Sequence, residues 1–232
     1  MMNKKNILDA INRLFERAPY FSINAMRDAL PEYKPNSVKS YVSLLKIEGL
    51  IFDAGCGWYS SIKETYRLDT APVEKLVEKL KTSFPSLEVV CWSTEQLNDM
   101  LLHQPAKHVQ FAYVERPAIN RVADKLRKSG YHVYANPGKE QIRRTFKVED
   151  NTVVVLPITT ESPQSNGFAA IEKIMVDVLA DALPFAIINI DEFCKGASTL
   201  IRKYRIDICL LNRYSIRRKR DILSLLDKTL FN

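Results

Sequence analysis

The sequence of 232 residues contains only 7 glycines, and it has none of the glycine-rich motifs that hold phosphate groups or expose a nucleophile. The patterns G-x-x-x-x-G-K-S/T, G-x-G-x-x-G, G-x-S-x-G and H-E-x-x-H are all missing. A nucleotidyltransferase needs a Gly-Ser opening followed by two aspartates on a strand, because paired carboxylates hold the magnesium ion. The nearest segment, residues 92–95, lacks that pair. The sequence therefore predicts no enzyme and no cofactor.

Cysteine and histidine are also scarce, with 4 and 3 residues. None of the cysteines forms a C-x-x-C pair, and no histidine lies at a metal-ligand spacing from them, so a metal site is not expected. We expect four unpaired thiols that pack as small hydrophobic side chains in a reducing cytoplasm. The residues are Cys56, Cys91, Cys194, Cys209, His103, His108 and His132.

Long hydrophobic runs are absent, since no segment approaches the roughly 18 apolar residues of a membrane span. The first residues lead into an alternation of apolar and polar positions, which is not the pattern of a signal peptide. With 46% hydrophobic and 26% charged residues, the composition is that of a globular protein. These features predict a soluble cytoplasmic protein with no membrane partner, and its length favours two domains.

The charge is positive and unevenly distributed. The formal net charge is +7, and residues 1–67 hold ten Lys and Arg against seven Asp and Glu. Residues 199–232 hold nine against three, so the excess is concentrated in the tail. A basic excess of this kind attracts polyanions such as nucleic acid or an anionic surface.

The N-terminal third follows the order of a winged helix-turn-helix. Apolar residues recur at helical spacing in three short segments, Ser22 is placed to cap the second, and a glycine-rich turn follows the third between two strand-like segments. We assign this module to residues 1–68 and expect it to bind double-stranded DNA. The expected elements are helices at 3–17, 23–30 and 36–48 and strands at 50–52 and 58–60.

From residue 72 to residue 232 strands and helices alternate, which predicts an α/β domain with a mixed sheet and C-terminal helices. The fold class expected for the whole chain is therefore α+β or α/β. The expected strands are 87–92, 108–114, 131–134 and 152–158, and the expected helices are 72–83, 94–102, 117–129, 169–182, 191–204 and a basic last helix at 215–230.

The third helix is the expected recognition element, because its apolar face is needed for the core and its polar face must point outward. Asparagine pairs with adenine in the major groove, and serine or lysine reaches bases or phosphates. Two cations after the second strand are candidate phosphate contacts. The alternative is a solvated face of a protein-interaction module. The candidate DNA-binding residues are Lys34, Asn36, Ser37, Lys39, Ser40, Ser43, Lys63 and Arg67.

Four consecutive cations, Arg217, Arg218, Lys219 and Arg220, stand near the end of the chain. If Ser215 caps the last helix, they occupy its first turn, where positive charge opposes the helix dipole. This local cost suggests an outside partner, either a phosphate backbone or an acidic protein surface, and a solvated charged face is the alternative.

A metal-dependent nuclease is a rival hypothesis that needs carboxylates gathered by folding. Glu161, Glu172 and Asp177 are the candidates. Otherwise Glu172 and Asp177 are expected to be surface or capping residues on the helix at 169–182.

The whole chain resembles the AbiEi-like antitoxins of abortive-infection toxin–antitoxin systems. The resemblance lies in the early winged helix, the wing Gly57-Trp58-Tyr59, the segment 92–97 and the helix segment 171–179, which looks like the family's Pro-Glu-Lys-x-x-x-Asp-Leu helix. It implies a regulator that binds inverted repeats in its own promoter and counters a nucleotidyltransferase-like toxin. We therefore expect an autorepressor, with a nucleic-acid-processing metalloenzyme and a winged helix that never touches DNA as alternatives.

Overall fold

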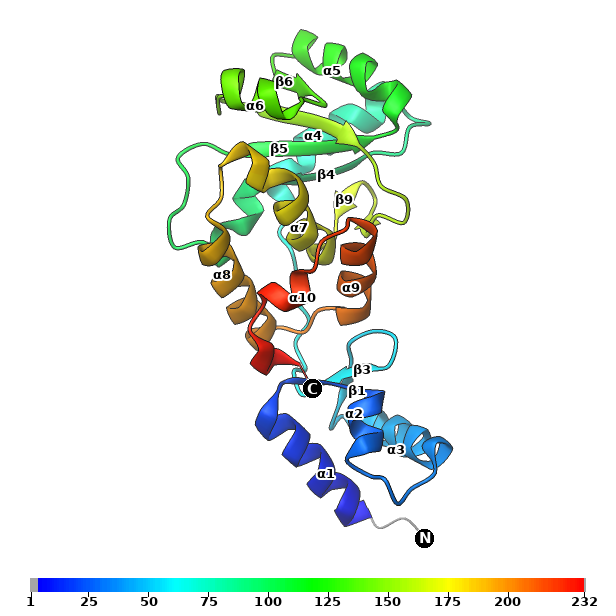
Figure 1. Cartoon of the computed structure of the whole chain (residues 1–232). Helices are drawn as coiled ribbons and strands as arrows, with labels where there is room; N and C mark the ends of the chain where they lie inside the picture. Colours follow the sequence, from blue (N-terminus) through cyan, green and yellow to red (C-terminus); the bar gives the residue numbers. More distant parts are fainter. Residues whose placement is uncertain (1–3, 232) are drawn as a thin grey trace.

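The computed structural model describes residues 4–231, and its N-terminal part combines three helices with a small sheet (Figure 1). The three strands form an antiparallel sheet in the order β1-β3-β2. Ser22 caps the second helix as expected, because its hydroxyl accepts from the Ala25 amide at 3.1 Å. The expected first helical residue, Asn3, lies outside the described residues. The elements are α1 (Lys4–Arg17), β1 (Tyr20–Ser22), α2 (Ile23–Asp28), α3 (Pro35–Ile47), β2 (Phe52–Asp53) and β3 (Trp58–Ser60).

The larger part of the chain is built on a six-stranded sheet in the order β6-β7-β5-β4-β9-β8. The β5–β7, β6–β7 and β4–β9 pairs are parallel, whereas β4–β5 and β8–β9 are antiparallel, so the expected mixed sheet is confirmed. The strands are β4 (Val90–Ser93), β5 (Val109–Val114), β6 (His132–Ala135), β7 (Thr152–Pro157), β8 (Gln164–Ser165) and β9 (Phe168–Ala169).

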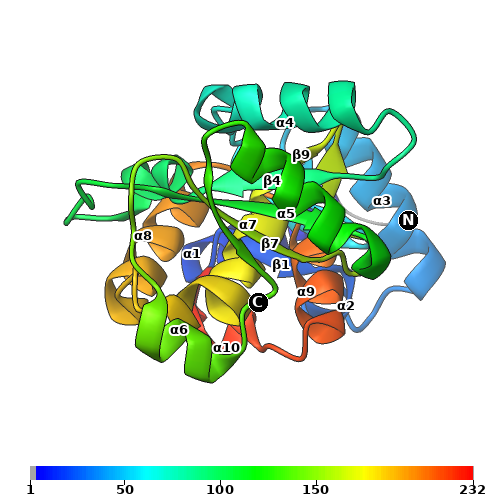
Figure 2. The same cartoon turned by 90° about the horizontal axis from the view of Figure 1, so that it is seen from above.

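Helices cover both faces of this sheet (Figure 2). Alternate residues of the buried strands point to opposite sides, so each face of the sheet packs against its own set of helices. Cys91 and Val155 pack under α4 (Ala71–Ser83) and α5 (Ile119–Lys128), while Trp92 and Val154 pack against the C-terminal helices. Those helices are α7 (Ile171–Asp177), α8 (Ile190–Lys203), α9 (Ile208–Arg217) and α10 (Ile222–Leu225). The remaining elements are α6 (Lys139–Thr145) and the short helices η1 (Thr94–Met100), η2 (Arg116–Ala118), η3 (Val178–Ala182), η4 (Leu183–Phe185) and η5 (Lys228–Leu230).

The expected single helix at 215–230 is wrong. The helix α9 already begins at Ile208 and ends at Arg217, and Lys219 then adopts a positive φ of 53°. A left-handed residue cannot continue a right-handed helix, so the chain turns and restarts as α10 and η5. Ser215 lies in the last turn of α9, where its hydroxyl accepts from the Ile222 amide at 3.2 Å, so it is not at a helix start.

Contacts cross the expected boundary between residues 1–68 and 72–232. The Tyr20 side chain is buried in the large core, and its hydroxyl accepts from the Ile206 amide at 3.2 Å and donates to the Tyr204 carbonyl oxygen at 3.1 Å. The Arg205 guanidinium donates to the carbonyl oxygen of Ile62 at 2.8 Å. The two-domain division stays a prediction, and these contacts tie its two parts together.

The expectation of four unpaired thiols is wrong for two of them. Cys56, between β2 and β3, forms a disulfide with Cys209 in α9, across 153 residues of sequence. Cys91 is a buried free thiol and Cys194 a half-buried one. Across residues 4–231, no helix combines the length and the apolar character that crossing a membrane requires.

Candidate functional site

The N-terminal half of α3 presents a polar face to solvent. Its opposite face carries Val38, Val42 and Leu45, which pack into the core with α1 and α2. These exposures agree with the expected outward face, whereas the DNA contact itself stays a prediction. Of the candidate residues in this region, Lys34, Asn36, Lys39, Ser40 and Ser43 are exposed and Ser37 is half-buried.

The polar side chains of this face differ in the hydrogen bonds that they still offer. The Ser40 hydroxyl donates to the Asn36 carbonyl oxygen at 3.1 Å, and the Ser43 hydroxyl donates to that of Lys39 at 3.1 Å. Each hydroxyl oxygen keeps acceptor capacity, although its proton is already used. Within residues 4–231, the side chains of Asn36 and Lys39 have no partner. The Asn36 amide can therefore both donate and accept, as pairing with adenine requires.

The C-terminal half of α3 is apolar on the same outward side. Leu44 is 50% exposed and Ile47 is 82% exposed, and Leu50 just beyond the helix is 44% exposed. The neighbouring Lys46 is bound to the Asp53 carboxylate at 2.5 Å. The outward stripe thus changes from polar to apolar along the helix, and contiguous apolar exposure of this kind is typical of a contact surface.

The hairpin of β2 and β3 is attached to the rest of the chain. The Cys56–Cys209 bond joins its turn to the first turn of α9, and the Ile208 amide donates to the Ala54 carbonyl oxygen at 2.9 Å. Gly55 approaches so closely that a Cβ there would overlap the Asp207 carboxylate. The hairpin is therefore packed against protein and is not a free wing.

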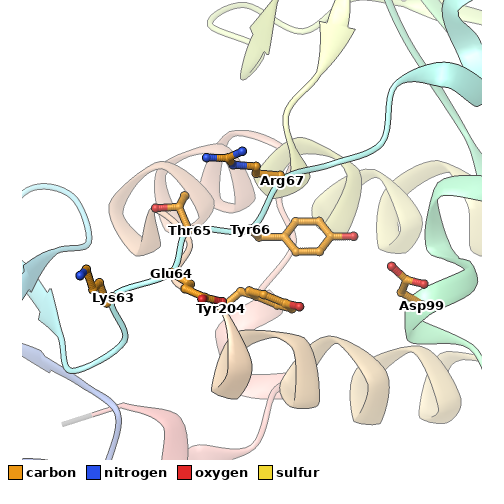
Figure 3. Close-up of a pocket in the computed structure, with 7 residues that line it drawn as sticks. All are labelled: Lys63, Glu64, Thr65, Tyr66, Arg67, Asp99 and Tyr204. Carbon is orange, nitrogen blue, oxygen red and sulfur yellow. The ribbon is translucent and has the colours of Figure 1, made fainter.

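The candidate phosphate contacts Lys63 and Arg67 lie in the linker between β3 and α4. They help to line a cavity of about 710 Å³ together with Tyr66, Tyr204 and Asp99, among others. In Figure 3 the rings of Tyr66 and Tyr204 extend toward Asp99, whereas the two cations point to the other side of the linker. The two ring centroids are 5.6 Å apart. Both cations are exposed, but they belong to the linker and not to the face of α3.

The basic run at 217–220 lies at the C-terminal end of α9, where positive charge is favourable, so its expected place in a first helical turn is wrong. Arg217 binds Glu161 at 2.5 Å, and Arg218 binds Asp181 at 2.6 Å. Burial lowers the pKa of Arg218, but the carboxylates of Asp177 and Asp181 offset this effect and hold the pKa above its usual value. Both arginines bind carboxylates within the protein, Arg218 is half-buried, and Arg217, Lys219 and Arg220 are exposed.

A buried ionic cluster lies between α7, α9 and the sheet. The Lys173 ammonium is fully buried, binds the Asp177 carboxylate at 2.6 Å, donates to the Tyr214 hydroxyl at 2.8 Å and lies 3.7 Å from the ring centroid of Tyr113. The Tyr214 hydroxyl donates to the second Asp177 oxygen at 3.0 Å. Burial lowers the pKa of Lys173 more than the Asp177 charge raises it. The cluster satisfies its own hydrogen bonds and ties α7 to α9.

The expected surface role of Glu172 and Asp177 is therefore wrong, since both are buried. The sequence carried one signal for the buried pair, which is the spacing of two opposite charges within α7. Lys173 and Asp177 are four residues apart, which places them together on one face. Glu161, Glu172 and Asp177 bind separate partners, and residues 4–231 contain no group of three His, Cys, Asp or Glu arranged for a metal ion.

The segment 92–97, part of the resemblance noted above, has a structural explanation. Ser93 and Gln96 form a capping box at the start of η1, and the Gln96 amide donates to the Asp69 carbonyl oxygen at 2.6 Å. The Thr94 hydroxyl accepts from the Val109 amide at 2.9 Å. This segment positions the linker against the sheet, and its side chains do not converge on a cavity.

Replacing Glu172 with glutamine is expected to raise the free energy of unfolding at pH 7. Burial raises the pKa of Glu172, although the Asp207 amide donates to its carboxylate at 2.9 Å. The folded state then binds more protons than the unfolded state, so the charged carboxylate costs stability as the pH rises through the folded pKa. Glutamine keeps the acceptor oxygen without the charge.

Urea denaturation of Glu172→Gln and wild type at pH 7 and pH 4 measures this effect, with the exposed Glu78→Gln as the matched control. The gain should shrink as the pH falls toward the ordinary carboxyl pKa of about 4.3, because the Glu172 carboxyl of the folded wild type is then mostly protonated and uncharged. A variant less stable than wild type at pH 7 would show that the Glu172 charge is stabilising.

Comparison with known proteins identifies a family for the chain but no activity. A family model described as a family of unknown function matches residues 37–230, which includes most of α3, the hairpin and the whole six-stranded sheet. No curated protein matches the chain.

Proposed function

The chain belongs to this family of unknown function (DUF6577), and from its geometry we propose that it is a sequence-specific DNA-binding regulator that reads the major groove with α3. The observation that carries the proposal is the exposed polar half of α3, in which Asn36 and Lys39 have no partner among residues 4–231. Recognition helices contact bases with their N-terminal residues, and this is the polar half.

The order of the N-terminal elements supports the same proposal. A helix, a strand, two helices and two strands follow one another, and the three strands pair as β1-β3-β2. A winged helix that docks its third helix in the groove would have its elements in this order, and this agreement supports the proposal. Because the β2–β3 hairpin is joined to α9, the proposed DNA contacts come from α3 and not from the hairpin tip.

The regulatory part of the proposal rests on the resemblance to AbiEi-like antitoxins. It predicts an autorepressor that binds inverted repeats upstream of its own gene, with a nucleotidyltransferase-like toxin as the functional partner. The buried cluster around Lys173 supports no enzymatic role, since its charges are paired inside the protein. We propose no chemical step for this chain.

The double variant Asn36→Ala/Ser40→Ala is expected to weaken binding to the native upstream DNA by about 1–3 kcal/mol for each base that is no longer recognised. Both residues are exposed, so the fold should not change. Gel-shift titration with specific and scrambled DNA measures the effect, and Asn120→Ala on the exposed side of α5 is the control. Equal affinity of the double variant and wild type for the upstream DNA would remove α3 from the role.

A second candidate function is a protein-interaction module, and the apolar half of α3 favours it. Leu44, Ile47 and Leu50 together expose an apolar surface that base recognition does not need. The two candidates differ in the gel-shift experiment, because an interaction module shows no preference for the upstream DNA over scrambled DNA.

A further inference from the structure

One of the two cysteines of the disulfide between the hairpin and α9 is an exposed residue. Cys56 is exposed in the turn between β2 and β3, with a positive φ of 39°, whereas Cys209 is half-buried in the first turn of α9. Their Cα atoms are 5.6 Å apart, the usual separation for a disulfide. The bond is thus accessible to a small thiol from the Cys56 side.

We infer that Cys56 and Cys209 form a thiol-exchange site, in which a low-molecular-weight thiol such as glutathione opens the bond and thereby releases the hairpin from α9. This inference goes beyond the proposed function and does not depend on DNA binding. It assigns a reactive role to a pair of cysteines that sequence reasoning treated as inert.

The geometry also selects the direction of the exchange. A glutathione thiolate attacks the sulfur of the exposed residue Cys56, the S–S bond breaks, and Cys209 leaves as a thiolate. The leaving thiolate lies at the N-terminal end of a helix of 10 residues, where the helix dipole stabilises negative charge. Cys209 then takes a proton from water. A second glutathione resolves the mixed disulfide on Cys56, giving two cysteine thiols and one oxidised glutathione, so two electrons pass from glutathione to the protein.

The hydrogen bonds that remain after reduction of the disulfide determine which part of the chain can move. After reduction, the hairpin turn keeps one backbone hydrogen bond to α9, from the Ile208 amide to the Ala54 carbonyl oxygen. The Tyr20 hydroxyl and the Arg205 guanidinium bind elsewhere between the two parts of the chain and do not involve either cysteine. We therefore expect the hairpin to loosen locally while the N-terminal part of the chain stays in place.

The test uses the full chain carrying Cys194→Ser, which removes the half-buried free thiol and leaves Cys91 buried. The protein is oxidised with glutathione disulfide, incubated with or without reduced glutathione, and labelled with iodoacetamide for mass analysis. We expect no label on the oxidised native protein and labels on Cys56 and Cys209 after reduction. Hydrogen exchange should become faster at the amides of 54–58 and stay unchanged at 204–206.

Two further variants test the direction of attack. With oxidised glutathione, Cys209→Ser should form a mixed disulfide at Cys56 faster than Cys56→Ser forms one at Cys209. Absence of labelling after reduced glutathione, or labelling with unchanged exchange at 54–58, would overturn the inference. Wild-type protein measured in parallel keeps the result independent of the folding of any variant.

Discussion

Replacing Lys173 with methionine is expected to lower the free energy of unfolding by about 3–5 kcal/mol, because it leaves the buried Asp177 carboxylate without its ammonium partner. Neither side chain has any exposed area. Arg218 lies 3.6 Å from Asp177 but is already bound to Asp181, so it compensates only in part. Methionine has nearly the length of lysine, and the destabilisation therefore reports the missing charge more than a cavity. Urea denaturation at pH 7 measures it.

The double variant Lys173→Met/Asp177→Asn is the matched control for charge. It removes both ions, and asparagine can still accept from the Tyr214 hydroxyl, which donates to Asp177 at 3.0 Å. We expect it to be more stable than Lys173→Met alone, since no unpaired charge remains buried. If the single variant is destabilised by less than about 1 kcal/mol, the range of an exposed pair, the cluster is not a dry ionic contact.

The N-terminal helices can be predicted from the sequence because local signals determine them. The Ser22 cap and the apolar spacing of Val38, Val42 and Leu45 recur in the structure. The strand β1 is missed by sequence reasoning because it has only three residues and exists through pairing with β3, where Phe21 faces Tyr59. Such a pair depends on residues distant in the chain, and no local pattern encodes it.

The basic run at 217–220 is evident in the sequence, but its predicted position within a helix is wrong. The sequence predicts that four consecutive cations oppose the dipole of a helix that starts at residue 215. In the structure α9 instead ends at Arg217, so the cations lie at a helix C-terminus. Lys219 adopts a left-handed conformation, which ends the helix. Glycine or asparagine usually occupies such a position, so a lysine there gives no signal of it in the sequence. The partners of Arg217 and Arg218, Glu161 and Asp181, come from other elements, so their ion pairs are equally hidden from a local pattern.

Replacing Gly196 with alanine is expected to lower the free energy of unfolding by about 3 kcal/mol, the upper part of the range for overpacking. Gly196 lies inside α8, and a Cβ built there overlaps the Met100 carbonyl oxygen and comes within 2.6 Å of its carbon. The obstacle is backbone at the end of η1, which cannot rotate away as a side chain can. The helix and η1 would have to separate, and this would disturb the packing of Phe193 and Leu97 in the large core.

Helix propensity alone makes the opposite prediction, so the experiment can distinguish the two explanations. Alanine in place of glycine inside an ordinary helix adds about 1 kcal/mol of stability, so the two views differ in sign. Urea denaturation of Gly196→Ala against wild type decides between them. Gly138→Ala is the control, because its φ is ordinary and nothing lies within 4 Å of the added carbon, and it should change stability little. A stabilised Gly196→Ala protein would mean that the backbones of α8 and η1 do not approach closely enough to exclude a methyl group.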